Sequence, residues 1–305
     1  MPCHTSPLKN HNDPHLVLRL KDLMNDWKQA VKERLSIPAS SIPHSWQRIP
    51  DIVSGDRICL FVTVLRHGRM VPHAAHQGRA WAARGFKVLV IAVTNDPDGD
   101  VPLENLEFAS GILLRTNKGY DFGAWSAAIQ SLPMVREAGL LALANDSVFG
   151  PLDGFTTVLE RVERSTADLV ALTDSHHHRY HFQSYIMFYK RGALQSDVFK
   201  SFWRKVRTGD RWTVIVRYET RLLKTFENAG LTGEVLFPSG HGAPPTLLGW
   251  KALVDRGFPF VKVQLLRDNP FNDDLSNWRD FIRLRGYDPV LCEDVLDDPT
   301  RRSSS

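Results

Sequence analysis

Short apolar runs alternate with amphipathic segments through the middle of this chain, and that alternation limits the fold more than any other feature. Apolar runs of this length, bounded by turn residues, are typical of buried strands. Six of them occur, at 57–65, 86–93, 111–115, 140–144, 168–172 and 184–189. Helical patterns stand between them at 73–84, 122–131 and 155–164. The order predicts an α/β fold with a mostly parallel, twisted sheet flanked by helices.

The segments on either side of this region have a different character. From Leu16 to Leu35 apolar residues recur every three or four positions among lysines, which predicts an amphipathic N-terminal helix. We expect this helix to dock on the main domain, with contact to a membrane surface or a partner as the alternative. Residues 36–56 contain several prolines and are interpreted as a connector. Residues 196–296 predict a more helical C-terminal part.

These patterns predict one main domain with extensions at both ends. The expected units are an N-terminal tail, helix and connector at 1–56, the main domain at 57–296 and a disordered tail at 297–305.

Composition excludes several classes of protein. The chain has no apolar run near the roughly 18 residues that a spanning helix needs, and residues 1–10 lack a signal-peptide core. We therefore expect a cytoplasmic protein. The three cysteines are far apart and form no metal-ligand spacing. The net charge of +4 is mild, and basic residues alternate with acids, so nucleic acid is not an expected partner.

The most informative motif is the segment 117–125, NKGYDFGAW, which follows the third apolar run. Gly119 permits close approach of the backbone to a ligand. Asn117 and Asp121 can hydrogen-bond a base or a ribose, and Arg115 is positioned to reach a phosphate. The alternative is a plain strand-to-helix turn in which the polar side chains cap the following helix.

A second polar group, Asn145-Asp146-Ser147, follows the fourth apolar run. In open α/β sheets ligands bind beyond the carboxyl ends of the strands, so the two motifs are expected at one edge. Asp146 is then a candidate ligand for Mg²⁺ or Mn²⁺ bridging a diphosphate, because hard cations prefer oxygen. Asn145 is placed in the donor site. A turn residue without function is the alternative for Asp146.

Candidate bases and hydrogen-bond donors lie further along the chain. A cation on a diphosphate would suit an enzyme that acts on a nucleotide-sugar. Transfer of the sugar with inversion at its anomeric carbon needs a base that takes the proton of the acceptor hydroxyl. Asp174 and Glu219 are the candidates for that role, unless they are surface acids or helix caps. His181, Gln183 and Ser184 are expected to orient donor or acceptor, or else to be satisfied polar groups at a strand entry.

Several other chemistries are disfavoured. Consecutive side chains on an extended segment point to opposite faces, so the run 176–178 (HHH) rarely binds one zinc ion. Ser184 is not in a G-x-S-x-G elbow, which argues against a serine hydrolase. The absence of a Walker loop and of G-x-G-x-x-G after the first strand argues against P-loop enzymes and dehydrogenases.

Four motifs, in order, resemble the rhamnan synthesis protein F family: NKGYDFGAW, NDSVFGPL at 145–152, HFQSY at 181–185 and GFPFVKVQLLRDNP at 257–270. The resemblance extends over about 58–270. It implies a GT-A-like fold and a role in bacterial cell-surface polysaccharide assembly, often as a rhamnosyltransferase.

The same resemblance implies roles for individual residues. Asn117, Gly119 and Asp121 fall in the nucleotide-sugar site. Asn145 and Asp146 match the place of the acidic metal motif of GT-A enzymes. The chain has one acid there instead of two, which leaves dependence on a divalent cation open.

The leading hypothesis is an inverting glycosyltransferase. Its expected donor is a nucleotide-sugar, for example dTDP-rhamnose, and its acceptor a glycan or a lipid-linked glycan of a cell-surface polysaccharide or lipopolysaccharide. A position at the inner face of the cell membrane is compatible with this role. The alternatives are a non-catalytic binding module in a glycan-assembly complex and, more remotely, a metal hydrolase that uses the histidine run.

Overall fold

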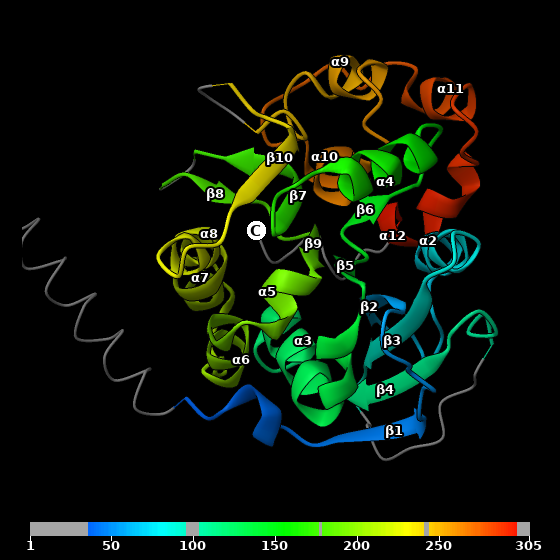
Figure 1. Cartoon of the computed structure of the whole chain (residues 1–305). Coiled ribbons are helices and arrows are strands. Elements are labelled where there is room, and N and C mark those ends of the chain that lie inside the picture. The colour runs from blue at the N-terminus through cyan, green and yellow to red at the C-terminus, as the bar shows by residue number, and fades with distance from the viewer. Residues whose placement is uncertain (1–35, 96–103, 177–178, 241–243, 298–305) are drawn as a thin grey trace, which may run out of the picture. The chain divides into compact units, whose positions relative to one another are not determined.

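A sheet of nine strands organises the described part of the chain (Figure 1). The computed structural model describes residues 36–95, 104–176, 179–240 and 244–297. From Pro38 onward the chain forms one compact unit that contains the sheet. The helix expected at 16–35 and residues 298–305 of the expected tail lie outside the described residues.

The strands of the main sheet follow a fixed order from one edge to the other, and β8 (His181–Phe182) pairs with β7 beside this path. The order is β1 (His44–Arg48), β4 (Gly111–Arg115), β3 (Lys87–Val93), β2 (Arg57–Val64), β5 (Leu140–Asn145), β9 (Ile186–Lys190), β7 (Leu169–Ser175) and β10 (Gly233–Phe237).

The strand directions confirm the mostly parallel sheet predicted from the sequence. Strands β4, β3, β2 and β5 are parallel neighbours, and β7 and β10 form a further parallel pair. Strand β9 is antiparallel to both β5 and β7, so β5 and β7 run in the same direction. The carboxyl ends of these parallel strands therefore meet at one edge of the sheet.

The order reverses beside β2. The chain passes outward from β2 to β3 and β4, and then returns to β5 on the other side of β2. Leu60 in β2 faces Leu89 of β3 on one side and Leu143 of β5 on the other. A reversal of this kind opens a crevice at the carboxyl ends of the two strands, where ligands of α/β proteins bind.

Helices cover both faces of the sheet (Figure 1). The first face carries α2 (Pro72–Ala82), α4 (Phe155–Arg164), α9 (Trp250–Asp255), α10 (Val263–Asp268), α11 (Trp278–Arg283), η4 (Pro289–Cys292) and α12 (Glu293–Leu296). The second carries α3 (Tyr120–Ser131), α5 (Arg191–Gln195), α6 (Asp197–Arg204), α7 (Arg211–Val214), the π-helical turn η3 (Ile215–Glu219) and α8 (Thr220–Glu227). Two short 3-10 turns complete the set, η1 (Ala39–Ser41) and η2 (Pro133–Glu137).

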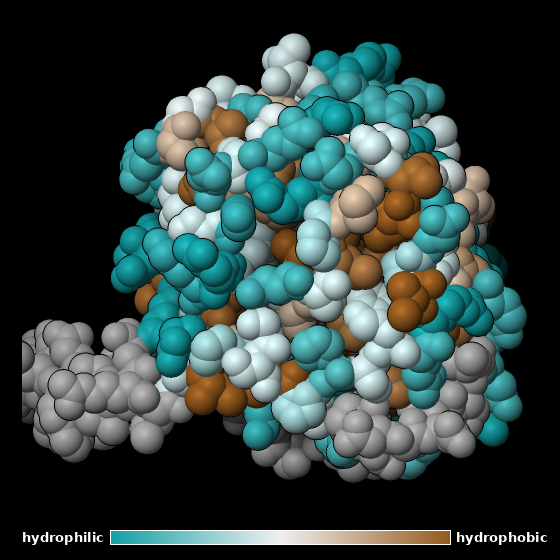
Figure 2. Space-filling model, turned by 60° about the horizontal axis from the view of Figure 1, so that its bottom comes forward, coloured by the Kyte–Doolittle hydropathy of each residue, from teal (hydrophilic) through white to brown (hydrophobic). Residues whose placement is uncertain are grey.

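Strand β2 shows why both faces are covered. Cys59 and Phe61 pack into the core on the first face, and Ile58, Leu60 and Val62 into the core on the second. Successive side chains of a strand point to opposite faces, so a continuous apolar strand requires a layer on each side. The surface in Figure 2 is mainly hydrophilic, with apolar residues in small separate groups, as expected when the apolar residues face the sheet.

Aromatic packing ties α3 to the sheet. The indole of Trp125 is fully buried and donates a hydrogen bond of 3.1 Å to the carbonyl of Leu60 in β2. Its ring also meets Trp203 of α6 edge to face. Removing such a ring from a core typically costs about 3–5 kcal/mol. This packing fixes α3 against β2 and α6.

The structure corrects the predicted connector at 36–56. Residues 44–48 form β1, which pairs antiparallel with β4 at the edge of the sheet, so the main unit begins before residue 57. Two small strands, β6 (Val148–Phe149) and β11 (Val261–Lys262), form a separate antiparallel pair. Strand β10 also lies in the region predicted to be more helical. No helix among the described residues has the length and apolar character to cross a bilayer.

Candidate active site

The candidate site lies at the carboxyl ends of β2 and β5, where the strand order reverses. Asp146 follows β5 directly, and its Oδ2 accepts hydrogen bonds from the Thr63 hydroxyl at 2.9 Å and the Val64 amide at 3.1 Å. Its backbone carbonyl contacts Nε2 of His73 at 3.0 Å. Among the described residues Oδ1 of Asp146 has no hydrogen-bond partner. One carboxylate oxygen of Asp146 therefore binds the end of β2, and the other is available to bind a ligand.

Asp121 and Asn145 lie close together, although the strands β4 and β5 that lead to them are not neighbours in the sheet. Asp121 lies in the first turn of α3, and its Oδ2 accepts a hydrogen bond of 2.7 Å from the Asn145 amide. The Asn145 Oδ1 accepts hydrogen bonds from the Ser147 hydroxyl at 2.6 Å and the Ser147 amide at 3.1 Å. Asn145 is 5% exposed. We infer that it orients Asp121 and Ser147 rather than offering much surface of its own to a ligand.

Lys262 was not identified from the sequence, yet it reaches the same place from β11. Its Nζ donates to the Ser147 hydroxyl at 3.3 Å. The same atom lies 4.0 Å from the centre of the Tyr185 ring, which is a cation–π distance. Burial lowers the pKa of Lys262 from 10.5 to about 8, while the charges of Glu219 and Asp121 act in the opposite direction.

Asp121, Asp146, Glu219 and Lys262 form one electrostatic group, which we call the acid–lysine cluster. Burial, together with the negative charges of Asp146 and Glu219, raises the pKa of Asp121 to about 6. The hydrogen bond from Asn145 and the charge of Lys262 oppose the rise. Displaced pKa values of this kind gather where a protein has placed charges for binding or catalysis.

Glu219 enters the cluster from the second face of the sheet, the face that also carries α3. Its Oε1 accepts hydrogen bonds of 2.9 Å from both the amide and the hydroxyl of Ser184. Oε2 has no hydrogen-bond partner among the described residues. Glu219 is the last residue of η3, a π-helical turn between α7 and α8. Single π-helical turns occur frequently at functional sites, because the widened turn re-aims side chains.

The segment before α3 has an unusual backbone. Gly119 and Tyr120 adopt consecutive positive φ angles of 85° and 50°. A left-handed conformation costs about 1–2 kcal/mol for a residue with a side chain, and such strain gathers at functional sites. The Tyr120 side chain is 41% exposed. It therefore offers an aromatic ring beside Asp121.

Arg115 is located differently from the prediction. It is fully buried, and its guanidinium donates a hydrogen bond of 2.9 Å to the carbonyl of Lys118. Burial lowers its pKa to about 10. A Cβ atom on Gly123 would lie 2.8 Å from the same carbonyl, so the turn needs glycine there. Arg115 thus stabilises the turn from inside the protein, and its charge does not reach solvent. Asn117, in contrast, is exposed.

Asp174 and His181 form a neighbouring group at the end of β7. Asp174 is 2% exposed; its Oδ1 accepts a hydrogen bond of 2.6 Å from the Ser239 amide, and its carboxylate also bonds the Tyr180 hydroxyl. Nδ1 of His181 lies 2.8 Å from the carbonyl of Arg179. Asp174 is thus enclosed by partners, in contrast to Glu219.

Gln183 is linked to the acid–lysine cluster through a chain of hydrogen bonds. Its Oε1 accepts from the Thr173 hydroxyl at 2.7 Å. The Thr173 and Tyr185 hydroxyls share a hydrogen bond of 2.6 Å. The Tyr185 ring lies under Lys262. Gln183 therefore acts on the cluster by fixing the tyrosine on which the lysine rests.

The residues fit a divalent cation only in a limited way. Among the described residues no three His, Cys, Asp or Glu side chains gather as a metal site. Asp146 offers a single unpaired oxygen, and Asp121 resists ionisation below about pH 6. Mg²⁺ is commonly held by one or two carboxylates together with substrate phosphates. The donor set therefore fits an ion that arrives with a diphosphate and is held by Asp146.

These observations define an α/β domain with a polar, charged site at its topological switch point. The chain belongs to the rhamnan synthesis protein F family, whose model matches residues 90–278. All members of the acid–lysine cluster lie within the matched range.

Comparison with individual proteins gives relatives of moderate similarity. Virulence protein VirA of Vibrio anguillarum is 28% identical over 193 residues, which cover 51% of this chain and 62% of VirA. Uncharacterized protein y4gN of Sinorhizobium fredii (strain NBRC 101917 / NGR234) is 28% identical over 131 residues, which cover 41% of this chain and 34% of y4gN. The chain thus spans less than two thirds of the length of either relative.

Among solved structures, the glycosyltransferase GlyE of Streptococcus pneumoniae TIGR4 aligns over 82% of this chain and 64% of its own. The TM-score is 0.41 and the sequence identity 10%. Similarity at this level carries no argument about the site.

Proposed function

We propose that this chain is a glycosyltransferase that moves a sugar from a nucleotide-activated donor to a glycan. One observation carries the proposal: the acid–lysine cluster at the carboxyl ends of β2 and β5. A half-buried lysine among carboxylates suits a ligand that bears both phosphates and hydroxyl groups. Membership of a family described by rhamnan synthesis supports a GT-A-like transferase that acts on rhamnose.

The cluster divides into two sides in this proposal. Lys262 and Ser147 face the donor diphosphate, and a cation held by Asp146 would neutralise charge on the same group. Asp121, oriented by Asn145, accepts hydrogen bonds from the sugar or ribose hydroxyls. The charge that develops on the leaving nucleotide diphosphate is then met by groups already in place.

We assign the proton-accepting role to Glu219, with Asp174 as the second candidate. The acceptor hydroxyl oxygen attacks the anomeric carbon as the bond from that carbon to the diphosphate oxygen breaks. The hydroxyl proton passes to Oε2 of Glu219, and the electron pair of the broken bond leaves with the nucleotide diphosphate. The result is inversion without a covalent enzyme intermediate. Asp174 is less suited because its side chain is almost fully buried, whereas Glu219 is only half-buried.

Tyr120 is proposed to stack on the nucleotide base. The ring is exposed beside Asp121, and its strained backbone has no other evident reason. Tyr120→Phe is expected to retain donor affinity, whereas Tyr120→Gly is expected to weaken it by roughly 10-fold, since stacking on an aromatic ring contributes about 1–3 kcal/mol. Calorimetry with the nucleotide diphosphate measures the change. Glycine accepts the positive φ, so Tyr120→Gly should keep or raise the melting temperature, and unchanged affinity would contradict the stacking role.

The proposed function is tested by a panel of nucleotide-sugars. Binding stabilises a protein by mass action, so a matching donor is expected to raise the melting temperature, and dTDP-rhamnose is the first candidate. Release of nucleotide diphosphate from that donor, with an oligosaccharide or lipid-linked acceptor present, then reports transfer. If no donor in the panel binds or is turned over at millimolar concentration, the proposal is wrong.

The second candidate is a non-catalytic nucleotide-sugar or glycan-binding module of a polysaccharide-assembly complex. The single acid at position 146 favours the binding module, because a cation on the diphosphate would have few protein ligands. Calorimetry separates the two: binding of a donor without turnover on any acceptor supports the module. A cytoplasmic location at the inner face of the cell membrane fits either role and remains part of the proposal.

A further inference from the structure

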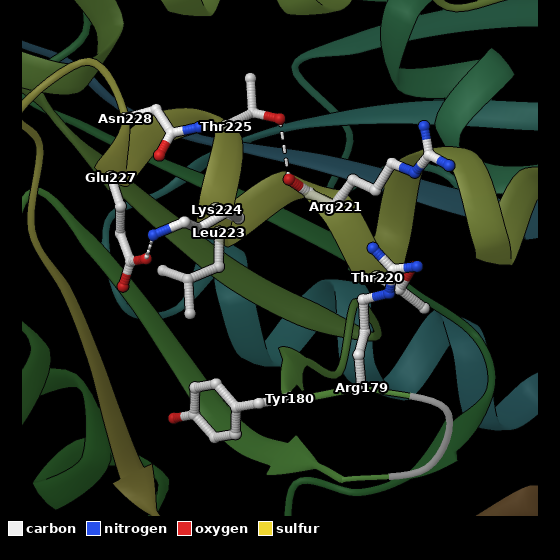
Figure 3. Close-up of a pocket in the computed structure, with 9 residues that line it drawn as sticks. All are labelled: Arg179, Tyr180, Thr220, Arg221, Leu223, Lys224, Thr225, Glu227 and Asn228. Carbon is white, nitrogen blue, oxygen red and sulfur yellow. Dashed lines mark hydrogen bonds and ion pairs between the residues drawn. The ribbon is translucent and has the colours of Figure 1, made fainter.

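A hollow opens along α8. It has a volume of about 520 Å³ and is formed by α8 and the residues that precede β8 (Figure 3). We call it the α8 pocket. Its lining residues are Arg179, Tyr180, Thr220, Arg221, Leu223, Lys224, Thr225, Glu227 and Asn228.

The α8 pocket carries an excess of positive charge. It contains three basic side chains and one acid, and that acid, Glu227, lies 3.6 Å from Lys224. Arg179 and Arg221 have no ion-pair partner among the described residues. Guanidinium groups bind carboxylates and phosphates through paired hydrogen bonds. The pocket therefore offers two guanidinium groups that no carboxylate of the described residues pairs with.

The remaining lining suits a sugar. Asn228 offers an exposed amide group, and the exposed ring of Tyr180 forms one wall of the hollow (Figure 3). Pockets of about 300–1,000 Å³ hold small ligands, so the volume suits one or two sugar rings. A purely inorganic anion would leave the Asn228 amide and the tyrosine ring without a ligand contact.

One peptide bond and one hydrogen bond join the α8 pocket to the two candidate bases. Thr220 follows Glu219 directly in the chain, where η3 passes into α8. The hydroxyl of Tyr180 hydrogen-bonds the carboxylate of Asp174. The pocket is thus close to both candidate bases, which suits a site for the acceptor.

We propose that the α8 pocket binds an anionic saccharide, a sugar unit that bears a phosphate or a carboxylate, and that this unit belongs to the acceptor glycan. The assignment to the acceptor rests on the proposed transferase function. Binding of the anionic sugar does not, since it depends only on the pocket itself.

Binding is tested by calorimetry with three sugars of equal ring size: glucose 1-phosphate, glucuronate and glucose. The two anionic sugars are expected to bind at least about 10-fold more tightly than glucose, because hydrogen bonds between charged groups are stronger than those to neutral hydroxyls. The stronger of the two identifies phosphate or carboxylate as the natural group. Equal binding of all three, or no binding at millimolar concentration, would overturn the proposal.

Variants locate the binding. The double variant Arg179→Gln/Arg221→Gln is expected to remove the preference for anionic sugars, and the matched control Arg204→Gln/Arg256→Gln, at exposed arginines outside the pocket, is expected to retain it. Glu227→Gln should tighten anionic binding, because it removes the acid that competes for the pocket. If the pocket double variant keeps the preference, the site is elsewhere.

One further measurement separates this proposal from the proposed function. The pocket double variant should bind the nucleotide-sugar donor as the unaltered protein does, while its KM for an anionic acceptor rises and its KM for donor does not. Absence of any donor binding in the unaltered protein would overturn the transferase and leave the anionic-sugar pocket standing. Loss of donor binding in the double variant would instead overturn the separate pocket.

Discussion

Lys262→Gln is expected to reduce sugar transfer by about 10²- to 10³-fold, the loss typical when one preorganised donor to a developing charge is removed. The ammonium group is held by Ser147 and the Tyr185 ring, and it is the basic member of the acid–lysine cluster. Rates of nucleotide diphosphate release at saturating donor measure the loss. The matched control is Lys251→Gln in α9, whose Nζ pairs with Asp274 away from the site.

The pH dependence of transfer distinguishes a loss of the Lys262 charge from a structural effect of the substitution. Burial lowers the pKa of Lys262 from 10.5 to about 8, so kcat/KM of the unaltered protein should fall as the pH rises through about 8. Lys262→Arg should retain part of the activity and lose this alkaline decline. The pKa of Lys262 is lower in the folded protein than its ordinary value of 10.5 in the unfolded chain. The charged lysine therefore lowers the stability of the fold, and this cost is greatest below about pH 8. For this reason Lys262→Gln should not lower the melting temperature. Full activity in Lys262→Gln would remove the lysine from the mechanism.

Asp146→Asn is expected to lower transfer by about 100-fold or more. Asparagine can still accept the hydrogen bonds from Thr63 and Val64, so the end of β2 should remain in place. What is lost is the charge on the unpaired oxygen. The melting temperature of the variant and its rate of donor turnover together report whether charge or folding has changed. Asp153→Asn, at an exposed acid of the same segment, is the control.

A chelator test assigns the role of that charge. If Asp146 holds a divalent cation on the diphosphate, EDTA should abolish transfer by the unaltered protein, Mn²⁺ should restore it, and Asp146→Asn should respond to neither. If transfer is insensitive to EDTA, Lys262 supplies the positive charge. Undiminished transfer by Asp146→Asn would exclude Asp146 from both roles.

The central strands of the fold were predictable because each is buried on both faces. Apolar runs at β2, β3, β4 and β5 leave no other stable arrangement than a covered parallel sheet. Strand β1 escaped prediction because its residues are only partly buried and prolines surround it. Strand β10 was missed for a similar reason, since it begins with the exposed residues Gly233 and Glu234.

The candidate site was predictable only in part. Asp121, Asn145 and Asp146 follow apolar runs, and the rule that ligands bind beyond strand ends identified them. Glu219 was identified on weaker grounds and enters the cluster through Ser184. Lys262 carries no local signal, because it lies more than a hundred residues from Ser147 and belongs to a strand of only two residues. Arg115 was assigned to a phosphate because sequence does not reveal that its guanidinium is enclosed.

The position of β2 has a consequence for experiments on shorter versions of this protein. The segment that matches the family begins at residue 90, inside β3. A fragment cut at that boundary would lack β2, the strand that both halves of the sheet pair with, and with it the Thr63 hydroxyl that engages Asp146. It would also lack β1, leaving β4 as an open edge available to other chains. The smallest unit that can be expected to fold therefore starts near Pro38, well before residue 90, where the match to the family begins.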